Sequence, residues 1–248
     1  MTPPLISCIV PVFNGERYLG EALESIRAQT YRPLEIIVAD DGSTDGTATV
    51  VAGFAEPVRY LFQPNAGPAA ARNLGLGAAQ GEYVAFLDAD DLLYPEKLAR
   101  QMARFQARLD LDLCVTYVRN FWTPELAQEE AHYRDHPRAQ AMPGYYTSTL
   151  LAKRALFDTV SQFNNAYRHG DATEWFVRVA ERAAVVELLP DVLTYHRMHD
   201  ANLSRRMASG SLDEYLRILK ASLDHRRHHN AGAPLPYGFP ASGWRGEP

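Results

Sequence analysis

The first hundred residues alternate between short apolar runs and segments whose apolar side chains recur every three or four positions. The runs have the length of strands, and the first is nearly continuous, as in a strand covered on both faces. They span residues 5–12, 34–39, 58–62 and 83–87. Strand–helix alternation of this kind predicts an α/β fold, with a mostly parallel sheet and helices on both faces.

The segments between and after these runs predict four helices. Asn14 is placed to cap the first helix, the second passes through residues 48–54, and the alanine-rich residues 67–79 form the third. Pro95 suits the first residue of the fourth helix. The inner face of that helix is predicted to carry four apolar side chains at helical spacing, Leu98, Met102, Phe105 and Leu109.

The second half of the chain is less regular. Residues 119–146 mix aromatic, charged and proline residues without periodicity, which predicts a long loop with short helical pieces. A helix over residues 173–182 and a strand over residues 185–189 are expected next. Residues 231–248 are rich in Gly, Pro and Ala, and we expect a disordered tail there.

Two of the predicted strands end in carboxylates. Asp40 and Asp41 follow the second run, and Asp88, Asp90 and Asp91 follow the fourth. Ligands of such sheets bind at the carboxyl ends of the strands, so these side chains should meet in one crevice. Asp88 and Asp90 point to the same side of an extended chain, where like charges are unfavourable unless a cation lies between them. Mg²⁺ and Mn²⁺ prefer such oxygen ligands and commonly add substrate phosphates. The pattern predicts a site for a metal-bound phosphate, and an acidic surface turn is the alternative.

Composition narrows the class of protein. The net charge of −5, from 25 basic and 30 acidic side chains, argues against nucleic acid as the main partner. Cys8 and Cys114 both lie in predicted strands, where packed thiols are expected rather than a disulfide or a metal site. The chain has no apolar stretch near the roughly 18 residues of a membrane span, and its start does not resemble a signal peptide. We therefore expect a cytoplasmic protein without a transmembrane segment.

Four blocks of the first half together resemble the family 2 glycosyltransferases. They are residues 7–14 (SCIVPVFN), 38–45 (VADDGSTD), 65–67 (NAG) with 71–75 (ARNLG), and 86–91 (FLDADD). Four blocks in the family's order and spacing are far more specific than any one of them. The resemblance implies a GT-A fold, with a Rossmann-like, mostly parallel sheet and an irregular acceptor-side half. It also implies a nucleotide-sugar donor, a divalent cation and inversion at the anomeric carbon.

The resemblance assigns donor-binding roles to residues of these blocks. Asp41 would recognise the base with Asp40 beside it, and Asp88 would hold hydroxyls of the sugar or ribose. Asn65 and Gly67 would shape the loop beneath the donor. Backbone contacts complete the donor site that the family pattern implies, at Pro11, Val12 and Phe13, together with Ala89.

Arg72 and Asp90 are expected to meet the charged part of the donor. Arg72 lies on a predicted helix otherwise full of small residues, and its planar fork suits a phosphate or a base edge. A surface salt bridge is the alternative for Arg72. The family pattern gives Asp90 the cation, Mn²⁺ or Mg²⁺, that bridges the donor phosphates, with Asp88 as a further candidate ligand.

A weaker block resembles the family's acidic segment before a helix, where one carboxylate serves as catalytic base. It is residues 169–178 (HGDATEWFVR), in which Ala172 replaces one acid of the family's usual pair. Inversion needs a carboxylate to deprotonate the attacking hydroxyl, so Asp171 is the predicted base and Glu174 the reserve. A plain helix N-cap is the alternative for Asp171.

Residues 195–204 (YHRMHDANLS) resemble the family's late block. On that match His199 is a candidate third metal ligand or a diphosphate contact, since neutral imidazole commonly binds divalent metals. A structural histidine is the alternative, and His196 receives no role.

The sequence therefore predicts an inverting, metal-dependent glycosyltransferase with a nucleotide-sugar donor and a hydroxyl acceptor. Residues 1–118 would form the donor half, and residues 119–230 the acceptor and catalytic-base half of the same domain. A polysaccharide, a lipid-linked sugar or a small molecule all fit as acceptor. A non-catalytic nucleotide-sugar binding protein is one alternative, because of Ala172 and because Ser161 stands where the family has glycine. A sugar nucleotidyltransferase is another, although the chain lacks a glycine-rich, basic loop after the first strand.

Overall fold

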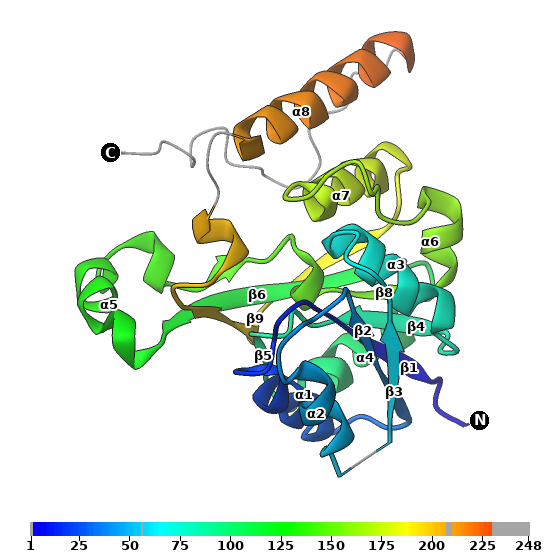
Figure 1. Cartoon of the computed structure of the whole chain (residues 1–248). Coiled ribbons are helices and arrows are strands. Elements are labelled where there is room, and N and C mark those ends of the chain that lie inside the picture. The colour runs from blue at the N-terminus through cyan, green and yellow to red at the C-terminus, as the bar shows by residue number, and fades with distance from the viewer. Residues whose placement is uncertain (1, 56, 207–209, 230–248) are drawn as a thin grey trace.

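A single mixed sheet runs through the molecule (Figure 1). The computed structural model describes residues 2–55, 57–206 and 210–229, and in these residues the sheet has nine strands. Their order is β3-β2-β1-β4-β8-β6-β9-β5, and β7 pairs with β6. The strands are β1 (Ile6–Val12), β2 (Leu34–Asp40), β3 (Val58–Phe62), β4 (Tyr83–Phe86), β5 (Leu92–Leu93), β6 (Leu113–Trp122), β7 (Met142–Pro143), β8 (Leu151–Lys153) and β9 (Val186–Met198).

Helices cover both faces of this sheet. The described helices are α1 (Leu19–Arg27), α2 (Thr47–Ala52), α3 (Pro68–Ala78), α4 (Lys97–Ala107), α5 (Ala127–Tyr133), α6 (Ala155–Val160), α7 (Asp171–Glu181) and α8 (Gly210–His229). Side chains of α1, α2 and α4 belong to one buried cluster, and those of α3, α6 and α7 belong to another. The sheet therefore separates two cores, as the strand–helix alternation of the first half predicts.

Strand β1 shows how the sequence pattern produces this architecture. Ile6, Cys8 and Val10 lie in the first core, whereas Ile9 lies in the second. Because successive side chains of a strand point to opposite faces, a strand buried on both sides needs a continuous apolar run. β1 pairs in parallel with β2 and with β4, so the carboxyl ends of the three strands meet at one edge of the sheet.

The loops after β1 and β2 are bonded to each other at that edge. The Gly15 backbone N–H donates to Thr47 Oγ1 over 2.9 Å, and the Thr44 backbone N–H donates to Asn14 Oδ1 over 2.8 Å. The expected capping role of Asn14 is therefore wrong: α1 begins only at Leu19, and the Asn14 side chain is already used by the second loop.

Helix α4 also differs in detail from its prediction. It begins at Lys97, two residues after Pro95. Its buried face includes Leu98, Met102 and Phe105, but Leu109 follows the last turn and is 84% exposed. The helix ends at Ala107, before the last residue of the predicted apolar face, so Leu109 is exposed to solvent.

The second half contains longer strands than expected. β6 continues to Trp122 and pairs in parallel with β9 along its length, from Leu113 opposite Val186 to Trp122 opposite Met198. The loop predicted over residues 119–146 therefore begins as strand, and it then forms α5 and short turns of 3-10 helix. The two strands support each other by backbone hydrogen bonds, which the mixed side chains of residues 119–122 do not reveal.

The last described segment is a helix that the sequence analysis did not predict. This helix, α8, lies beyond α7 and away from the sheet in Figure 1. The tail predicted over residues 231–248 lies outside the described residues.

Two expectations from composition can be compared with the structure. In the part of the chain that the structure describes, each helix is too short or too polar to cross a bilayer. Cys8 and Cys114 are buried free thiols, as expected.

Candidate active site

The predicted base-recognition carboxylates are buried and strongly hydrogen-bonded. Asp41 is 3% exposed and accepts three bonds, from Gln63 Nε2 (2.7 Å) and from the backbone N–H groups of Ala66 (2.9 Å) and Gly67 (2.8 Å). Asp40 accepts from the Ser43 N–H (2.7 Å) and from the Tyr60 hydroxyl. Burial, and then this bond to Asp40, raise the pKa of Tyr60 to about 12. Both carboxylates thus hold the loops at the strand ends.

These bonds explain the shape of the sheet edge where β1 and β2 end. Gly42 has a φ of 83°, and a Cβ on it would come within 2.7 Å of the Asn65 nitrogen, so this tight approach requires glycine. Asn65 donates to the Asp41 carbonyl over 2.9 Å, which fixes the loop before α3. Phe13, at the end of β1, keeps 53% of its surface exposed at this edge. Of the predicted base contacts, Asp41 is buried with both carboxylate oxygens hydrogen-bonded, whereas Phe13 offers an exposed ring.

Arg72 joins the two halves of the predicted site. It is 7% exposed on α3, and its guanidinium donates to Asp171 Oδ2 over 2.5 Å and to Asp88 Oδ1 over 3.0 Å. Burial alone would lower the pKa of Arg72, but the two carboxylates more than offset it and raise that pKa above its ordinary value. The third nitrogen, Nε, is buried without a hydrogen-bond partner. The surface salt bridge considered for Arg72 is therefore wrong, because this ion pair is buried between the halves.

Asp171 and Glu174 occupy different surroundings on α7. Asp171 is the first residue of the helix and 4% exposed, and Gly170 stands at the N-cap, so the interpretation as a capping side chain is wrong. Glu174 instead makes two 2.8 Å contacts with Arg178. Arg178 also donates to the carbonyls of Val160, Ser161 and Gln162 at the end of α6. Glu174 thus helps to hold the end of α6 through Arg178, whereas Asp171 is linked through Arg72 to Asp88 after β4.

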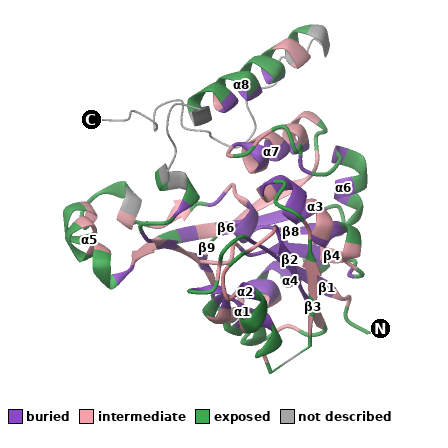
Figure 2. Ribbon diagram, viewed as in Figure 1, coloured by how far each residue is buried: buried purple, intermediate pink, exposed green. Residues whose placement is uncertain are grey.

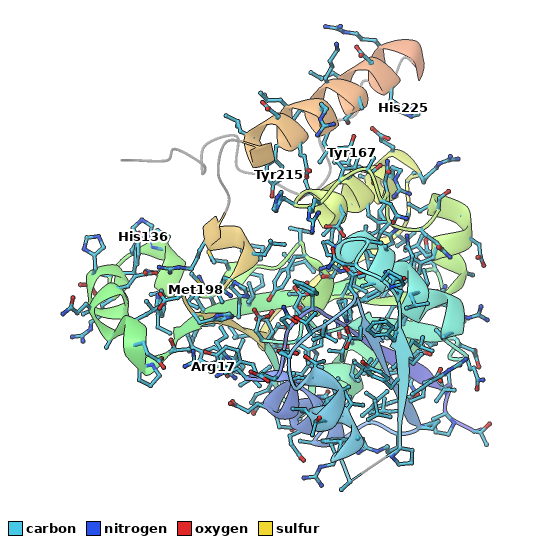
Figure 3. All side chains as sticks on the ribbon, viewed as in Figure 1. Arg17, His136, Tyr167, Met198, Tyr215 and His225 are labelled. Atoms are coloured by element: carbon cyan, nitrogen blue, oxygen red, sulfur yellow. The ribbon has the colours of Figure 1, made fainter. Side chains whose placement is uncertain are left out.

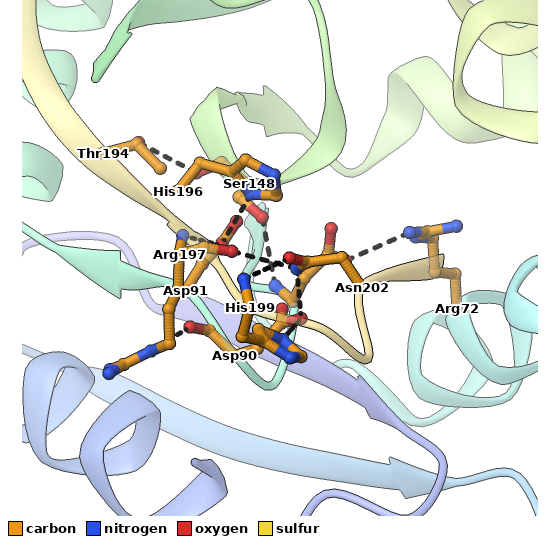
Figure 4. Close-up of polar contacts among 10 residues, drawn as sticks. Arg72, Asp90, Asp91, Ser148, Thr194, His196, Arg197, His199 and Asn202 are labelled. Atoms are coloured by element: carbon orange, nitrogen blue, oxygen red, sulfur yellow. Dashed lines mark hydrogen bonds and ion pairs between the residues drawn. The ribbon is translucent and has the colours of Figure 1, made fainter. Parts of the chain in front are cut away.

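The three aspartates after β4 have three different neighbours, and Figure 4 shows those of Asp90 and Asp91. The Asp88 carboxylate contacts Arg72 and is 31% exposed. Asp90 Oδ2 lies 2.9 Å from His199 Nε2. Asp91 is fully buried, and its Oδ1 accepts from His196 Nδ1 (2.8 Å) and from the backbone of β9. The acidic cluster is therefore no plain surface turn: it holds the end of β9 in place.

The buried pair of Asp91 and His196 is held as an ion pair near neutral pH. Burial raises the pKa of Asp91 to about 6, against the opposing effect of His196. Burial alone would lower the pKa of His196, but Asp91 outweighs it and raises that pKa to about 9. Asp91 Oδ2, the second oxygen of this carboxylate, is buried without a hydrogen-bond partner.

The surroundings of Asp90 fit a divalent cation. Burial would raise the pKa of Asp90, but His199 and His196 lower it, so the carboxylate is ionised and sits beside an imidazole. Carboxylate oxygen and imidazole nitrogen are suitable ligands for Mn²⁺. The Ala201 N–H donates to His199 Nδ1 over 3.2 Å, which places the ring proton on Nε2. Cation binding through Nε2 would need the other tautomer, with the proton on Nδ1. Among the described residues no three His, Cys, Asp or Glu side chains form a ready-made cage. Such a site is one that substrate phosphates and water would complete.

Several residues of the site were missed at the level of sequence. Asn202 donates to the Arg197 carbonyl (2.9 Å) and lies 3.3 Å from Asp90 Oδ2, and it belongs to the late block that carries His199. The Ser148 hydroxyl accepts the Asp88 N–H over 3.0 Å, and the buried Tyr146 hydroxyl has no hydrogen-bond partner. Burial, then Asp91 and its neighbouring carboxylates, raise the pKa of Tyr146 well above its usual value. Asn202 had a sequence signal, but residues 146–148 lie in a stretch without periodicity.

At one departure from the family pattern the backbone keeps a conformation typical of glycine. Ser161, where the family has glycine, has a φ of 73° and so adopts the conformation that favours glycine. Its carbonyl is held by Arg178 and by Trp175 Nε1 over 3.1 Å each. The turn after α6 is therefore kept by its partners in spite of the substitution.

Comparisons with solved structures agree with this architecture. The TarS structure of S. aureus in complex with UDP-GlcNAc superposes with a TM-score of 0.72 at 20% identity, over 89% of this chain and 66% of that chain. A mannosyltransferase from Pyrobaculum calidifontis, in complex with GDP-Man and Mn²⁺, gives a TM-score of 0.63 at 22% identity over 95% and 77%. At such identities the likeness shows the fold, which is the GT-A fold that the sequence predicts.

Sequence relatives extend the comparison. An uncharacterised glycosyltransferase of Rickettsia prowazekii is 42% identical over 229 residues, which are 86% of this chain and 69% of the relative. An uncharacterised glycosyltransferase of Haemophilus influenzae is 45% identical over 106 residues, 41% of this chain and 42% of that one. The family model described as glycosyl transferase family 2 matches residues 7–173, more than half of the chain. The chain therefore belongs to glycosyl transferase family 2 and is a glycosyltransferase.

Proposed function

We propose that the chain transfers a sugar from a nucleotide-sugar donor to a hydroxyl acceptor, with inversion at the anomeric carbon and with a divalent cation. The observation that carries this proposal is the Arg72 bridge between Asp88 and Asp171. It brings the predicted base next to the carboxylate predicted to hold the donor. The nucleotide sugars named for TarS and for the mannosyltransferase support the donor class.

Asp90 and His199 would hold Mn²⁺ or Mg²⁺, and Asp88 is the further candidate ligand. Bound there, the cation would offset the negative charge of the departing nucleoside diphosphate. The Mn²⁺ in the mannosyltransferase structure supports this choice of ion. Asp41, Asn65 and the backbone after β1 would shape the nucleoside end of the donor.

Asp171 is the proposed general base. The acceptor oxygen forms its bond to the anomeric carbon while the bond from that carbon to the diphosphate oxygen breaks. The hydroxyl proton passes to a carboxylate oxygen of Asp171, and the bonding electron pair leaves with the diphosphate. Attack from the face opposite the leaving group inverts the configuration. Positioned proton transfer of this kind typically contributes about 10²–10⁴-fold to the rate.

Arg72 has a second role in this scheme. Its guanidinium, now shared between two carboxylates, is a planar fork that also suits phosphate. A donor diphosphate would compete with Asp171 for Arg72. The carboxylate released in this way would be open to an acceptor hydroxyl, so the base becomes available only when the donor has bound.

A donor screen with Asp90 variants tests the proposal. Nucleoside diphosphates and their sugars are titrated calorimetrically into the chain with Mn²⁺ or with a chelator, and donor hydrolysis is followed by release of the diphosphate. We expect Mn²⁺-dependent binding, which Asp90→Asn weakens at least about tenfold. Asp200→Asn, an exposed acid in the adjacent turn, serves as the matched control. Equal affinity with and without metal would refute the role of Asp90, and binding of no nucleotide at all would refute the donor class.

A further inference from the structure

Helix α8 carries an apolar stripe that the fold leaves uncovered. Its members, here called the α8 leucine stripe, are Leu212, Leu216, Leu219 and Leu223, which are 63%, 55%, 50% and 54% exposed. They recur at intervals of four, three and four residues, the spacing of the seam between two packed helices. Figure 2 shows most of α8 as exposed. Contiguous exposed apolar side chains of this kind mark an interaction surface.

The opposite side of α8 is the one that is docked. Glu214, Ile218 and Ser222 are buried. Glu214 accepts the backbone N–H groups of residues 168–170 at distances from 2.8 to 3.1 Å, and the Ser222 hydroxyl donates to Glu181 over 2.9 Å. Figure 3 shows Tyr215 on the side of α8 that faces Tyr167. The docked face thus fixes α8 on α7, and the stripe points away from the rest of the described residues.

The charges beside the stripe favour a protein over a membrane as its partner. Asp213 and Asp224 alternate with Lys220 and Arg227 along the flank of α8. Arg227 is itself paired with Asp224, at 3.6 Å. A helix that lies in a bilayer interface carries mainly Lys and Arg on its polar face, because cytoplasmic lipid surfaces are anionic. Mixed signs instead suit a partner with a complementary row of charges.

A second copy of α8 supplies that complementary row when it runs antiparallel. In this register Leu212 lies opposite Leu223 of the second copy, and Leu216 lies opposite Leu219. Asp213 then falls within about 3 Å, measured along the helix axis, of Lys220 of the second copy. Two-fold symmetry repeats this attractive pair. A parallel arrangement would place Tyr215 and Ser222 beside the opposing lysine and arginine, without a pair of opposite charges.

We propose that the α8 leucine stripe forms a symmetric antiparallel helix pair with a second copy of this chain. The interface buries the stripe of each copy and is flanked by two Asp213–Lys220 ion pairs. Opposite charges at flanking positions set helix orientation and partner choice more than affinity. Neither residue of the ion pair touches the site around Arg72, so the pairing can be tested apart from the transfer reaction.

The oligomeric state of the whole chain tests this proposal. Sedimentation velocity over a wide range of protein concentration should show a monomer–dimer equilibrium. The double variant Leu216→Lys and Leu219→Lys should be monomeric, and it should fold because both side chains are exposed in the single chain. Leu109→Lys, at an exposed leucine far from α8, is the matched control and should leave the dimer unchanged.

Charge exchange tests the antiparallel register. Asp213→Lys should raise the dimer dissociation constant about tenfold at low salt, because two attractive pairs become repulsive. Adding Lys220→Asp to that variant should restore dimerisation. A wild-type chain that stays monomeric overturns the proposal, as does a dimer that survives both lysine substitutions in the stripe. Lipid-vesicle binding that depends on the stripe, without a dimer, would assign the surface to membranes instead.

Discussion

Arg72 and Asp171 form a buried ion pair across the two halves of the chain, with 2.5 Å between the guanidinium and the carboxylate. The same guanidinium contacts Asp88. Arg72 comes from α3 in the first half of the chain and Asp171 from the first turn of α7, 99 residues later. The pair therefore sets where the proposed base lies relative to the strand end that is proposed to hold the donor.

Replacing this guanidinium tests whether its geometry matters beyond its charge. Arg72→Lys keeps one positive charge, but an ammonium cannot present a planar fork to two carboxylates at once. We expect transfer to fall by about 10²-fold, as is typical when a reacting group is misplaced by about 1 Å. Arg59→Lys, on the exposed edge of β3, is the control. Steady-state kinetics together with nucleoside diphosphate affinity measure the effect, and unchanged values of both would contradict the role of Arg72.

The two carboxylates of α7 should differ in the kind of damage that their loss causes. Asp171→Asn is expected to leave donor and metal binding near normal and to cut transfer by about 10²–10⁴-fold. Glu174→Gln should retain transfer but lower the unfolding free energy, because it loosens Arg178 from the end of α6. Kinetics and urea unfolding of both variants separate the two roles. An Asp171→Asn variant that keeps most of its transfer rate would move the base elsewhere.

The first half could be predicted from sequence because each of its elements is specified locally. β1 has a continuous apolar run with a core on either side, and the carboxylates of its neighbours lie where the runs stop. The second half depends on long-range pairing. β6 and β9 are parallel strands more than sixty residues apart, so their full length follows from each other rather than from residues 119–122. The Arg72–Asp171 contact is also long-range, so the residues next to either one in the sequence could not predict it.

Glu214 links the unpredicted helix α8 to the proposed base. Its carboxylate accepts three backbone N–H groups just before Asp171, and these bonds lower the pKa of Glu214 although burial would raise it. A Cβ on Gly170 would lie 2.7 Å from Ile218, so α8 and this loop are closely fitted. We therefore regard Glu214 as a positioning residue for Asp171.

Glu214→Gln removes the charge that these N–H groups share. We expect the unfolding free energy to fall by about 1–2 kcal/mol, as for a hydrogen bond to a charged group. The turnover number should fall while the KM for donor stays near normal, because the loop carries the base and not the donor contacts. Asp224→Asn on the same helix is the control. Equal losses in turnover number and donor KM would indicate a general disturbance of the fold instead.

The buried Lys97 should make the unfolding free energy depend on pH, and this effect can be measured apart from transfer activity. It is fully buried on α4, its ammonium donates to the Leu150 carbonyl over 3.3 Å, and burial lowers its pKa from 10.5 to about 8. Between these two values the unfolded chain binds a proton that the folded chain has lost. The Lys97 contribution to stability therefore rises with pH above about 8, at about 1.4 kcal/mol per pH unit.

A Lys97→Met variant isolates that contribution. His196, whose folded pKa is about 9, and the buried cysteines, with pKa values of about 12, titrate in both proteins, so the difference between wild type and variant belongs to Lys97. At pH 7 the variant should be at least as stable, because a buried charge is replaced by an apolar side chain. From pH 7 to pH 9 the wild type should gain about 1.4 kcal/mol relative to the variant in urea unfolding. A difference that stays constant over this range would mean that Lys97 keeps its proton in the folded chain.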